Sequence, residues 1–466
     1  MVRALVCGTR GGGSNPPCCT KIMSKEKKFK PSKELPLGFV DRQEQELLIR
    51  DFVISNIKEV MIKYGFQYLE TPSFEYTDSI GKFLPDKERP EEGVFSFKDE
   101  KNWLSLRYDL TAPLARYVAK NYLELPKPFK RYQLGTVWRN EKPGPGRFRE
   151  FLQFDADYVG TKNLQADAEL CVLISEILEK CGLDKSDYTV KISSRKFTDK
   201  LFEQLKIKSK DQISTTLRVL DKIDRLGWGE AKKLLGEGRK DKSGDYTKGA
   251  NLKSDQIKII ENALKIKTPD SEDILEIVKI FQAYKFENYK FDPSVIRGLE
   301  YYTGPIFEVN LNFEVKNSKG QAIQFGSIGG GGRYDNLVSN FGNFDCPATG
   351  ISVGLDRLVF ALMQKKDFKI KAVRPVIICV FDKSRMKEYI EILNKLRISN
   401  IGSEIYPGEG KLKKQMEYAN KISSPAAILY GDNEIKIGKV TLKNLKSGKE
   451  TSVAIESLSD EIKKII

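Results

Sequence analysis

The sequence predicts an α+β fold with an inserted helical region and a smaller α/β domain at its C-terminal end. Strand and turn patterns dominate from about residue 66 to Val159, and they resume near Arg297. A Lys-rich region with helical periodicity separates these two parts, at about residues 190–290. After residue 373, apolar runs alternate with helical patterns in the order β-α-β-α-β, which indicates a small mixed domain.

The first 22 residues differ in composition from the rest of the chain. They include the stretch GGGSNPPCCT, which is rich in Gly, Pro and Cys and has no periodicity. Gly13-Ser14-Asn15-Pro16 is also what the common T-arm sequence of a tRNA gene would encode. We interpret residues 1–22 as a spurious or disordered extension and Met23 as the true start. The Lys-rich run up to Lys33 is typical of a solvated terminus.

The first catalytic-domain segment is expected to span residues 23–190. Apolar residues recur at helical spacing between Asp41 and Tyr64, and this helix should end at Gly65. Residues 66–70 then favour a strand that stops at Thr71-Pro72. A second helix is predicted over 165–181.

The remaining segments follow from similar patterns. A helical insertion is expected at 191–290, with a loop (GEGRKDKSGDYTKG) near its middle, and strands with a glycine cluster at 326–332 return in 291–365. A linker at 365–374 precedes the last domain, 373–466. Its predicted elements are a buried strand (376–381), a helix (384–397), a strand (402–406), a helix (411–421) and a strand (426–430).

The overall composition limits the possible partners. The chain has 79 Lys and Arg against 64 Asp and Glu, a net charge of +15. Such an excess suits a polyanion, because phosphate contacts release counterions. The alternative is an AT-rich genome that favours lysine. No apolar window approaches the ~20 residues of a spanning helix, and the seven cysteines form no CxxC pair, so we expect a reducing cytoplasm, no membrane and no zinc.

The chain contains no histidine, where average usage would give roughly ten. A Ser-His-Asp triad, a metal site with histidine ligands and an imidazole general base are therefore excluded. Selection against histidine is one explanation, and drift is the other. Without an imidazole, activity changes between about pH 5.5 and 7.5 should track the substrates rather than the enzyme.

The segment from Phe129 to Gly160 contains the most informative cluster of charged residues. Two apolar-rich strand candidates flank a loop with Pro143, Gly144, Pro145 and Gly146. The charged residues around this loop are Arg139, Glu141, Arg147, Arg149 and Glu150. Guanidinium groups bind phosphate bidentately, and a nearby carboxylate can hold Mg²⁺ or an amino group. The alternative is an ordinary charged hairpin.

This segment resembles motif 2 of class II aminoacyl-tRNA synthetases, with Glu141 two residues after Arg139 and GRFREF at 146–151. Residues 64–75, with Thr71-Pro72, resemble motif 1, whose proline lies at the dimer interface. GISVGLDRL at 350–358 resembles motif 3. The three motifs occur in the family's order. The resemblance implies a catalytic domain built on an antiparallel sheet flanked by helices, followed by an anticodon-binding α/β domain.

A second set of motifs points to one amino acid. RGLEYYTG at 297–304 is very close to the signature peptide of histidyl-tRNA synthetases, and GGGGRYD at 329–335 resembles their second characteristic block. LRYDLT at 106–111 also matches in position. The glycine cluster is not a phosphate loop of the GxxxxGK[ST] type, since that pattern is absent. The resemblance extends from about Pro36 to the C-terminus.

The resemblance implies a role for each matching residue. Arg139 and Arg297 would be catalytic: Arg139 binds the α-phosphate of ATP, and Arg297 reaches both the substrate carboxylate and that phosphate. The other ATP-binding residues would be Glu141 (adenine or a metal), Phe151 (stacking on adenine), and Arg147 and Arg357 (β,γ-phosphates). The histidine-binding residues would be Asp109, Thr111 and Gln153 at the ammonium group, Asp157 and Tyr302 facing the imidazole, and Tyr301.

This chemistry needs no histidine. The attacking carboxylate is already ionised, so adenylation requires positioning and charge neutralisation rather than a base. In three places this chain departs from the family, with Asn140 and Leu152 where histidine is usual and Glu300 in place of aspartate. None of these changes removes a group that the mechanism needs.

The implied partners are ATP with Mg²⁺, histidine, histidine tRNA and a second copy of the chain. Most of the family reads the extra 5′ guanosine of histidine tRNA with a glutamine, and Gly144 stands at that position. One alternative is a non-catalytic paralogue that regulates histidine biosynthesis. Such paralogues generally lack the anticodon domain and the catalytic arginine, whereas this chain keeps both. Another alternative is a synthetase for Thr or Pro, against which the RGLEYYTG block argues.

Overall fold

The computed structural model describes residues 32–81, 93–144, 146–240, 246–296, 302–317, 319–323 and 325–466. Within this part of the chain, an eight-stranded sheet forms the centre of the catalytic region, with the order β1-β5-β6-β15-β14-β11-β7-β10. The strands are β1 (Gln67–Tyr68), β5 (Phe129–Trp138), β6 (Glu150–Val159), β7 (Tyr188–Ser194), β10 (Tyr289–Phe291), β11 (Pro305–Leu311), β14 (Ser327–Arg333) and β15 (Ala348–Gly354).

This sheet is antiparallel except at its two edges. β1 runs parallel to β5, and β10 runs parallel to β7. All pairs between them are antiparallel. The predicted antiparallel sheet flanked by helices is therefore confirmed.

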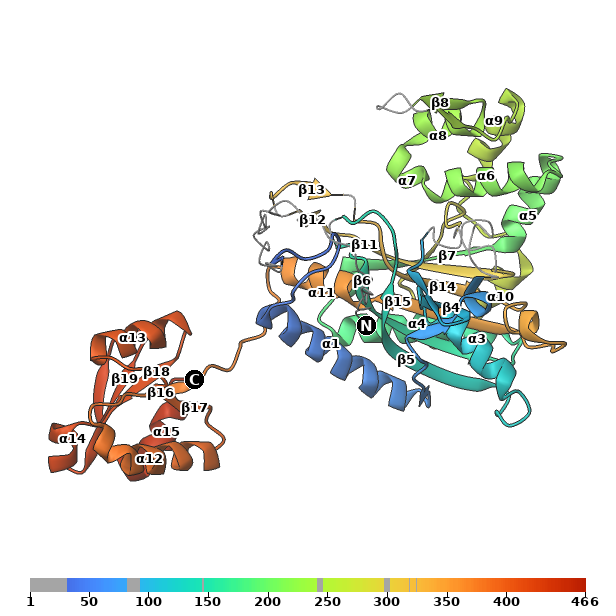
Figure 1. Cartoon of the computed structure of the whole chain (residues 1–466). Coiled ribbons are helices and arrows are strands. Elements are labelled where there is room, and N and C mark those ends of the chain that lie inside the picture. Colours follow the sequence, from blue (N-terminus) through green and yellow to red (C-terminus); the bar gives the residue numbers. More distant parts are fainter. Residues whose placement is uncertain are drawn as a thin grey trace, which may run out of the picture.

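Helices cover one face of the sheet (Figure 1). They are α1 (Glu44–Lys63), α4 (Leu164–Lys180), α10 (Glu272–Tyr284) and α11 (Leu355–Gln364). The first two agree with the helices predicted at 41–64 and 165–181. Their apolar residues share one core with Phe154, Ala156 and Tyr158 of β6. Since side chains alternate along a strand, the intervening residues of β6 point to the opposite face.

One part of the catalytic region differs from the prediction. Strand and turn patterns were expected to dominate 66–159, but α3 (Thr111–Lys120) forms a helix there. Leu114, Ala115 and Val118 are buried at helical spacing against Phe129 of β5. Pro113 lies in the first turn, where a missing N–H costs nothing. Beside α3, β2 (Phe74–Tyr76), β3 (Ser96–Asp99) and β4 (Asn102–Leu106) form a small separate sheet in the order β2-β4-β3.

The segment that follows β7 and precedes α10 in the sequence forms a second core. Its elements are α5 (Arg195–Gln204), α6 (Lys210–Asp221), α7 (Ile223–Leu226), α8 (Trp228–Leu235), α9 (Ser254–Ala263), β8 (Gly238–Lys240) and β9 (Tyr246–Lys248). Figure 1 shows this group as a lobe apart from the central sheet. The region is helical as predicted. Its expected central loop, however, includes a short antiparallel pair, β8 with β9.

The C-terminal region is a five-stranded sheet in the order β17-β16-β18-β19-β20, with its own core. Its strands are β16 (Val376–Ile378), β17 (Ser403–Ile405), β18 (Ala426–Leu429), β19 (Lys439–Asn444) and β20 (Glu450–Ala454). Its helices are α12 (Met386–Ile398), α13 (Leu412–Lys421), α14 (Asp432–Lys436) and α15 (Leu458–Lys463). The predicted β-α-β-α-β order is present, and the antiparallel strands β19 and β20 follow it. Among the described residues, no helix is both long and apolar enough to cross a membrane.

Candidate active site

Several of the predicted site residues lie on the face of the sheet that the helices leave open. Gln153, Asp155 and Asp157 of β6 alternate with the core residues and therefore share this face. On β5, Gly135, Gln133 and Arg131 lie opposite them in register. On the other side, β15 places Gly354, Ser352 and Gly350 opposite the same three residues.

Two of these positions require small residues. A Cβ atom on Gly350 would lie 1.9 Å from Oδ1 of Asp157, so glycine leaves space for that carboxylate. A Cβ atom on Gly135 would lie 2.6 Å from Nη2 of Arg107. Arg107 is buried and donates to the carbonyls of Thr136 (2.8 Å) and Thr71 (2.6 Å), so its guanidinium joins the motif 1 segment to β5.

The beginning of α3 adds Asp109 and Thr111 to this cluster of polar residues, called the ammonium site below because three of its members were predicted to bind the substrate ammonium group. Asp109 accepts the N–H of Ala112 at 3.0 Å, which caps the first turn of the helix. Thr111 donates its hydroxyl to Oδ2 of Asp155 at 3.3 Å. Gln153 donates Nε2 to Oδ1 of the same carboxylate at 2.8 Å. The structure thus brings together the three residues predicted to receive the substrate ammonium group.

Asp157 lies at the far end of the same row. It contacts Nη2 of Arg131 at 2.9 Å and accepts the hydroxyl of Tyr334 at 2.5 Å. Burial raises the pKa of Asp157 to about 7, although Arg131 acts in the opposite direction. Burial also raises the pKa of Asp109 to about 6. The absence of histidine predicted that activity changes between about pH 5.5 and 7.5 track the substrates, whereas these two raised pKa values predict a contribution from the enzyme.

Arg139 and Phe151 form the part of the site assigned to ATP. Arg139 donates Nε to the carbonyl of Tyr108 at 3.0 Å, directly before Asp109 in sequence. Its guanidinium carbon lies 5.2 Å from the centre of the Phe151 ring. The side chains of Glu141 and Arg147 are exposed on the motif 2 loop. Arg139, the cation expected at the α-phosphate, is thus next to Phe151, the predicted stacking partner of adenine, and next to the segment that contains Asp109.

Arg357 joins motif 3 to the motif 2 loop through Phe325. Its guanidinium lies 4.3 Å from the centre of the Phe325 ring and donates to the carbonyl of Phe325. A Cβ atom on Gly146 would lie 2.9 Å from the same ring. Gly146 has a φ of +64°, a conformation that glycine adopts without strain. This packing places Arg357 near the end of the loop that contains Arg147.

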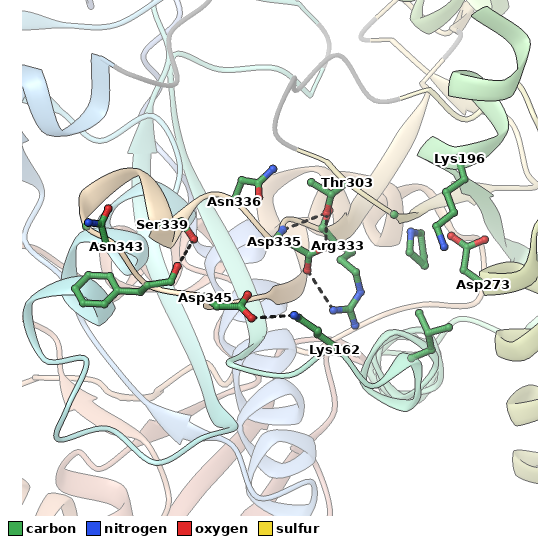
Figure 2. Close-up of a pocket in the computed structure, with 15 residues that line it drawn as sticks. Lys162, Lys196, Asp273, Thr303, Arg333, Asp335, Asn336, Ser339, Asn343 and Asp345 are labelled. Carbon is green, nitrogen blue, oxygen red and sulfur yellow. Dashed lines mark hydrogen bonds and ion pairs between the residues drawn. The ribbon is translucent and has the colours of Figure 1, made fainter. Parts of the chain in front are cut away.

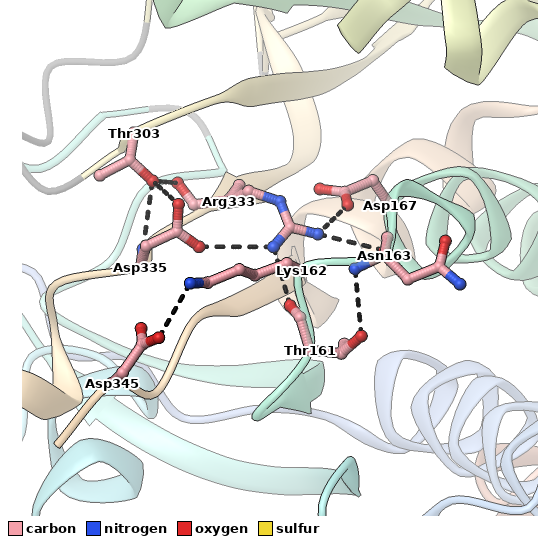
Figure 3. A network of polar contacts seen from close by, with 8 residues as sticks. All are labelled: Thr161, Lys162, Asn163, Asp167, Thr303, Arg333, Asp335 and Asp345. Carbon is pink, nitrogen blue, oxygen red and sulfur yellow. Dashed lines mark hydrogen bonds and ion pairs between the residues drawn. The ribbon is translucent and has the colours of Figure 1, made fainter.

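Tyr302 is buried against Gly332, where a Cβ atom would lie 3.0 Å from its ring. The next residue, Thr303, donates its hydroxyl to Asp335 at 2.7 Å, and its N–H donates to the carbonyl of Arg333 at 2.8 Å. Arg333 in turn donates to the carbonyl of Thr161 at 2.8 Å and pairs with Asp167 (Figure 3). This network holds the signature segment against the start of α4.

A cavity of about 750 Å³ lies beyond this network (Figure 2). Thr303, Arg333, Asp335, Lys162 and Asp273 are among the residues that line it. None of the predicted catalytic, histidine-binding or ATP-binding residues is part of this lining. The cavity is therefore separate from the row on β6, and the chemistry is better placed on that row.

Two predicted residues, Arg297 and Tyr301, lie outside the described residues. Within the described part of the chain, His, Cys, Asp and Glu form no cluster of three or more that could hold a metal ion. Sequence reasoning missed four residues of the site: Arg131, Asp155, Tyr334 and Ser352. Tyr334 lies within the GGGGRYD block, and Asp155 lies between Gln153 and Asp157, so the period of two along a predicted strand could have identified Asp155.

This fold and site define a class II aminoacyl-tRNA synthetase: an antiparallel sheet with a motif 2 arginine beside the polar residues Asp109, Thr111 and Gln153 on its open face, and motif 3 packed against the motif 2 loop. Residues 38–358 match the family model for histidyl-tRNA synthetase, and residues 375–465 match that for the anticodon binding domain. The chain therefore belongs to the histidyl-tRNA synthetase family.

Similar proteins agree with this assignment. The histidine–tRNA ligase of Bartonella quintana (strain Toulouse) is 44% identical over 464 residues, covering 93% of each chain. That of Brucella suis biovar 1 (strain 1330) is 43% identical and covers 92% of each chain. The crystal structure of histidyl-tRNA synthetase from Nostoc sp. PCC 7120 matches with a TM-score of 0.71 and 26% identity, covering 94% of this chain and 100% of that one.

Proposed function

We propose that this chain activates histidine with ATP and transfers it to the 3′ end of histidine tRNA, forming AMP and pyrophosphate. The observation that supports this most strongly is the position of Arg139 beside the cavity formed by Asp109, Thr111 and Gln153. A phosphate bound by Arg139 would lie next to an amino acid whose ammonium group occupies this cavity. That geometry brings the carboxylate nucleophile close to the α-phosphate.

The residues divide the work of adenylation between them. Phe151 offers a ring for adenine, and Arg147 and Arg357 offer guanidinium groups for the outer phosphates. Asp157 and Tyr334 can bind the imidazole, since their hydrogen-bonded pair is polar and buried. Arg139, with Arg297, would stabilise the negative charge that develops on the α-phosphate in the transition state. No side chain has to remove a proton in this step.

Mg²⁺ is expected to arrive with ATP, whose phosphates supply several of its ligands. The exposed carboxylate of Glu141 fits this role, because Mg²⁺ commonly uses one or two protein carboxylates together with substrate phosphates. When bound, the ion neutralises phosphate charge. We expect no zinc, because the chain has no histidine and Cys171, Cys181, Cys346 and Cys379 are buried and free.

We also propose that the chain works as a homodimer. The small sheet that follows motif 1 has an exposed aromatic face: Phe74 is 49% exposed, Tyr76 57% and Phe97 43%. The register of β2, β4 and β3 places these three side chains on one side of the sheet. Contiguous exposed aromatic residues commonly mark an interface. A second copy is the expected occupant, because this face directly follows Thr71-Pro72.

The dimer can be tested with a matched pair of variants. Tyr76→Asp should shift the mass in solution from two chains to one, because it puts a charge into an apolar contact. Trp103→Asp is the control, since Trp103 is 49% exposed on the opposite face of the same sheet. A dimer that survives Tyr76→Asp, or one that Trp103→Asp disrupts equally, would place the interface elsewhere.

We assign the remaining segments to tRNA. In this proposal, residues 23–190 and 291–365 form the catalytic domain, 191–290 contact the acceptor arm, and 373–466 bind the anticodon. We also propose that the enzyme works in the cytoplasm, because it uses ATP and tRNA. The test is the charging of a histidine tRNA transcript with labelled histidine. Formation of histidyl-tRNA with release of AMP is expected, whereas binding of the transcript without any charging would favour the regulatory paralogue.

A further inference from the structure

Asp155 has an unusual set of contacts for a buried carboxylate. It is 1% exposed and lies at the centre of the β6 row. Its oxygens accept three side-chain donors: the Thr111 hydroxyl (3.3 Å), Gln153 Nε2 (2.8 Å) and the Ser352 hydroxyl. Among the residues that the structure describes, no lysine or arginine forms an ion pair with it. Arg107 is close enough to interact with Asp155 electrostatically, but a buried carboxylate without a direct ion pair is still costly.

We infer that Asp155 is a positioning residue that turns the cavity into an acceptor-only site for the ammonium group of the substrate. This inference rests on the proposed activation of histidine. A threonine hydroxyl and a glutamine amide can each donate or accept. Asp155 takes the hydroxyl hydrogen of Thr111 and an amide hydrogen of Gln153. The Thr111 oxygen and the Gln153 carbonyl oxygen then remain as acceptors, beside the carboxylate of Asp109.

An ammonium group has three donors and no acceptor, so it matches such a site. A neutral amide at position 155 would not impose this arrangement, because its NH₂ group donates. Gln153 or Thr111 would then accept from it, and a donor would face the ammonium group. The loss would affect recognition of the amine, and contacts to the imidazole at Asp157 and Tyr334 would remain.

The charges around the cavity agree with this inference. Asp109, Asp155 and Asp157 lie close enough to affect one another, since Asp155 contributes to the raised pKa of both neighbours after burial. On the cationic side, Arg131 pairs with Asp157, and the guanidinium groups of Arg107 and Arg139 donate to backbone carbonyls. Of these three guanidinium groups only that of Arg131 forms an ion pair with one of the three carboxylates, so the ammonium group of histidine would be the cation in direct contact with the ammonium site.

The test uses Asp155→Asn and two ligands that separate the amine from the rest of histidine. Histidinol keeps the ammonium group and the imidazole but lacks the carboxylate. Imidazolepropionate keeps the imidazole and the carboxylate but lacks the amine. Asp155→Asn should weaken histidinol binding by roughly 10- to 100-fold, the usual effect of losing hydrogen bonds to a charged group. Imidazolepropionate should bind equally well or more tightly, because one negative charge has been removed.

Steady-state kinetics give an independent readout. In ATP–pyrophosphate exchange, Asp155→Asn should raise KM for histidine by a similar factor and leave KM for ATP unchanged. Asp273→Asn is the matched control: Asp273 is also buried, but it accepts a hydroxyl from Ser194 away from the β6 row. That variant should change neither ligand preference nor KM for histidine.

The outcomes separate this inference from the proposed function. Equal weakening of histidinol and imidazolepropionate would show a merely structural role and overturn the inference, as would no change in either. In both cases, the wild-type protein would still exchange pyrophosphate with histidine. If the wild-type protein shows no histidine-dependent exchange, the proposed function itself fails.

Discussion

Replacement of Arg131 by methionine should destabilise the protein in a pH-dependent way. Arg131 is 0% exposed and lies 2.9 Å from the carboxylate of Asp157, which is itself buried. Methionine keeps much of the side-chain volume but removes the cation. The folded variant can avoid a stranded charge only if Asp157 keeps its proton.

The size of the effect follows from the pKa of Asp157. Burial raises this pKa to about 7 in the wild-type protein, against about 4 in an unfolded chain. A raised carboxyl pKa means that the folded state binds more protons, so its stability falls as pH rises from about 4 to about 7 and then levels off. Without Arg131 the pKa rises further, and the fall continues above pH 7. Above pH 7 the variant therefore loses about 1.4 kcal/mol of its free energy of unfolding per pH unit relative to wild type.

Urea unfolding of both proteins at pH 6, 7, 8 and 9 measures this cost. The difference in the free energy of unfolding between wild type and Arg131→Met should be smallest at pH 6 and should widen above pH 7. Adding Asp157→Asn to Arg131→Met should remove the widening, because the titrating group is gone. Parallel stability curves between pH 7 and 9 would refute the reasoning, since they would show that Arg131 does not compensate the charge of Asp157.

Four further results are expected. Arg297→Ala should lower histidine-dependent pyrophosphate exchange by roughly 10²-fold, as loss of a transition-state cation commonly does; a wild-type rate would remove Arg297 from the chemistry. Neutralising Lys232, Lys233, Arg239 and Lys240 should reduce the slope of log K for tRNA binding against log salt concentration by about two rather than four, because Glu230 already pairs with Lys233 and Arg239. An unchanged slope would indicate that these residues only form a solvated face. Transcripts with and without the extra 5′ guanosine should be charged equally, because Gly144 is exposed and has no side chain to read a base; a large preference for the longer transcript would contradict this. With a triazole analogue of histidine, whose ring does not titrate near neutrality, activity should still rise with pH through about 6, because Asp109 must ionise to accept the ammonium group. A flat pH profile would show that the rise seen with histidine comes from titration of the substrate ring.

Strong local patterns predicted most of the fold. The apolar spacing between Asp41 and Tyr64 identified α1, and the two apolar-rich segments that flank the motif 2 loop identified β5 and β6. α3 was missed because its sequence begins Thr-Ala-Pro after a strand-like segment, and a proline inside a pattern usually argues against a helix. The strands β19 and β20 were missed because their apolar residues are few and stand among polar ones, as in KVTLKN and ETSVA.

The site was only partly predictable, for a physical reason. Motif resemblance identifies residues that are expected to contact substrates, such as Arg139 and Gln153. Arg131 lies on β5 and Ser352 on β15, the two strands on either side of β6, and only the register places them opposite Asp157 and Asp155. The pKa values of Asp109 and Asp157 also depend on burial, which composition cannot give. The absence of histidine therefore did not imply the absence of a group that titrates near neutrality.

The most direct test of the proposed function is ATP–pyrophosphate exchange measured with each of the twenty amino acids. Exchange should depend on histidine alone, because in the proposed site the ammonium-binding residues lie beside Asp157 and Tyr334, which would bind the imidazole. Exchange with threonine or proline, or none with any amino acid, would contradict the assignment of histidine as the substrate.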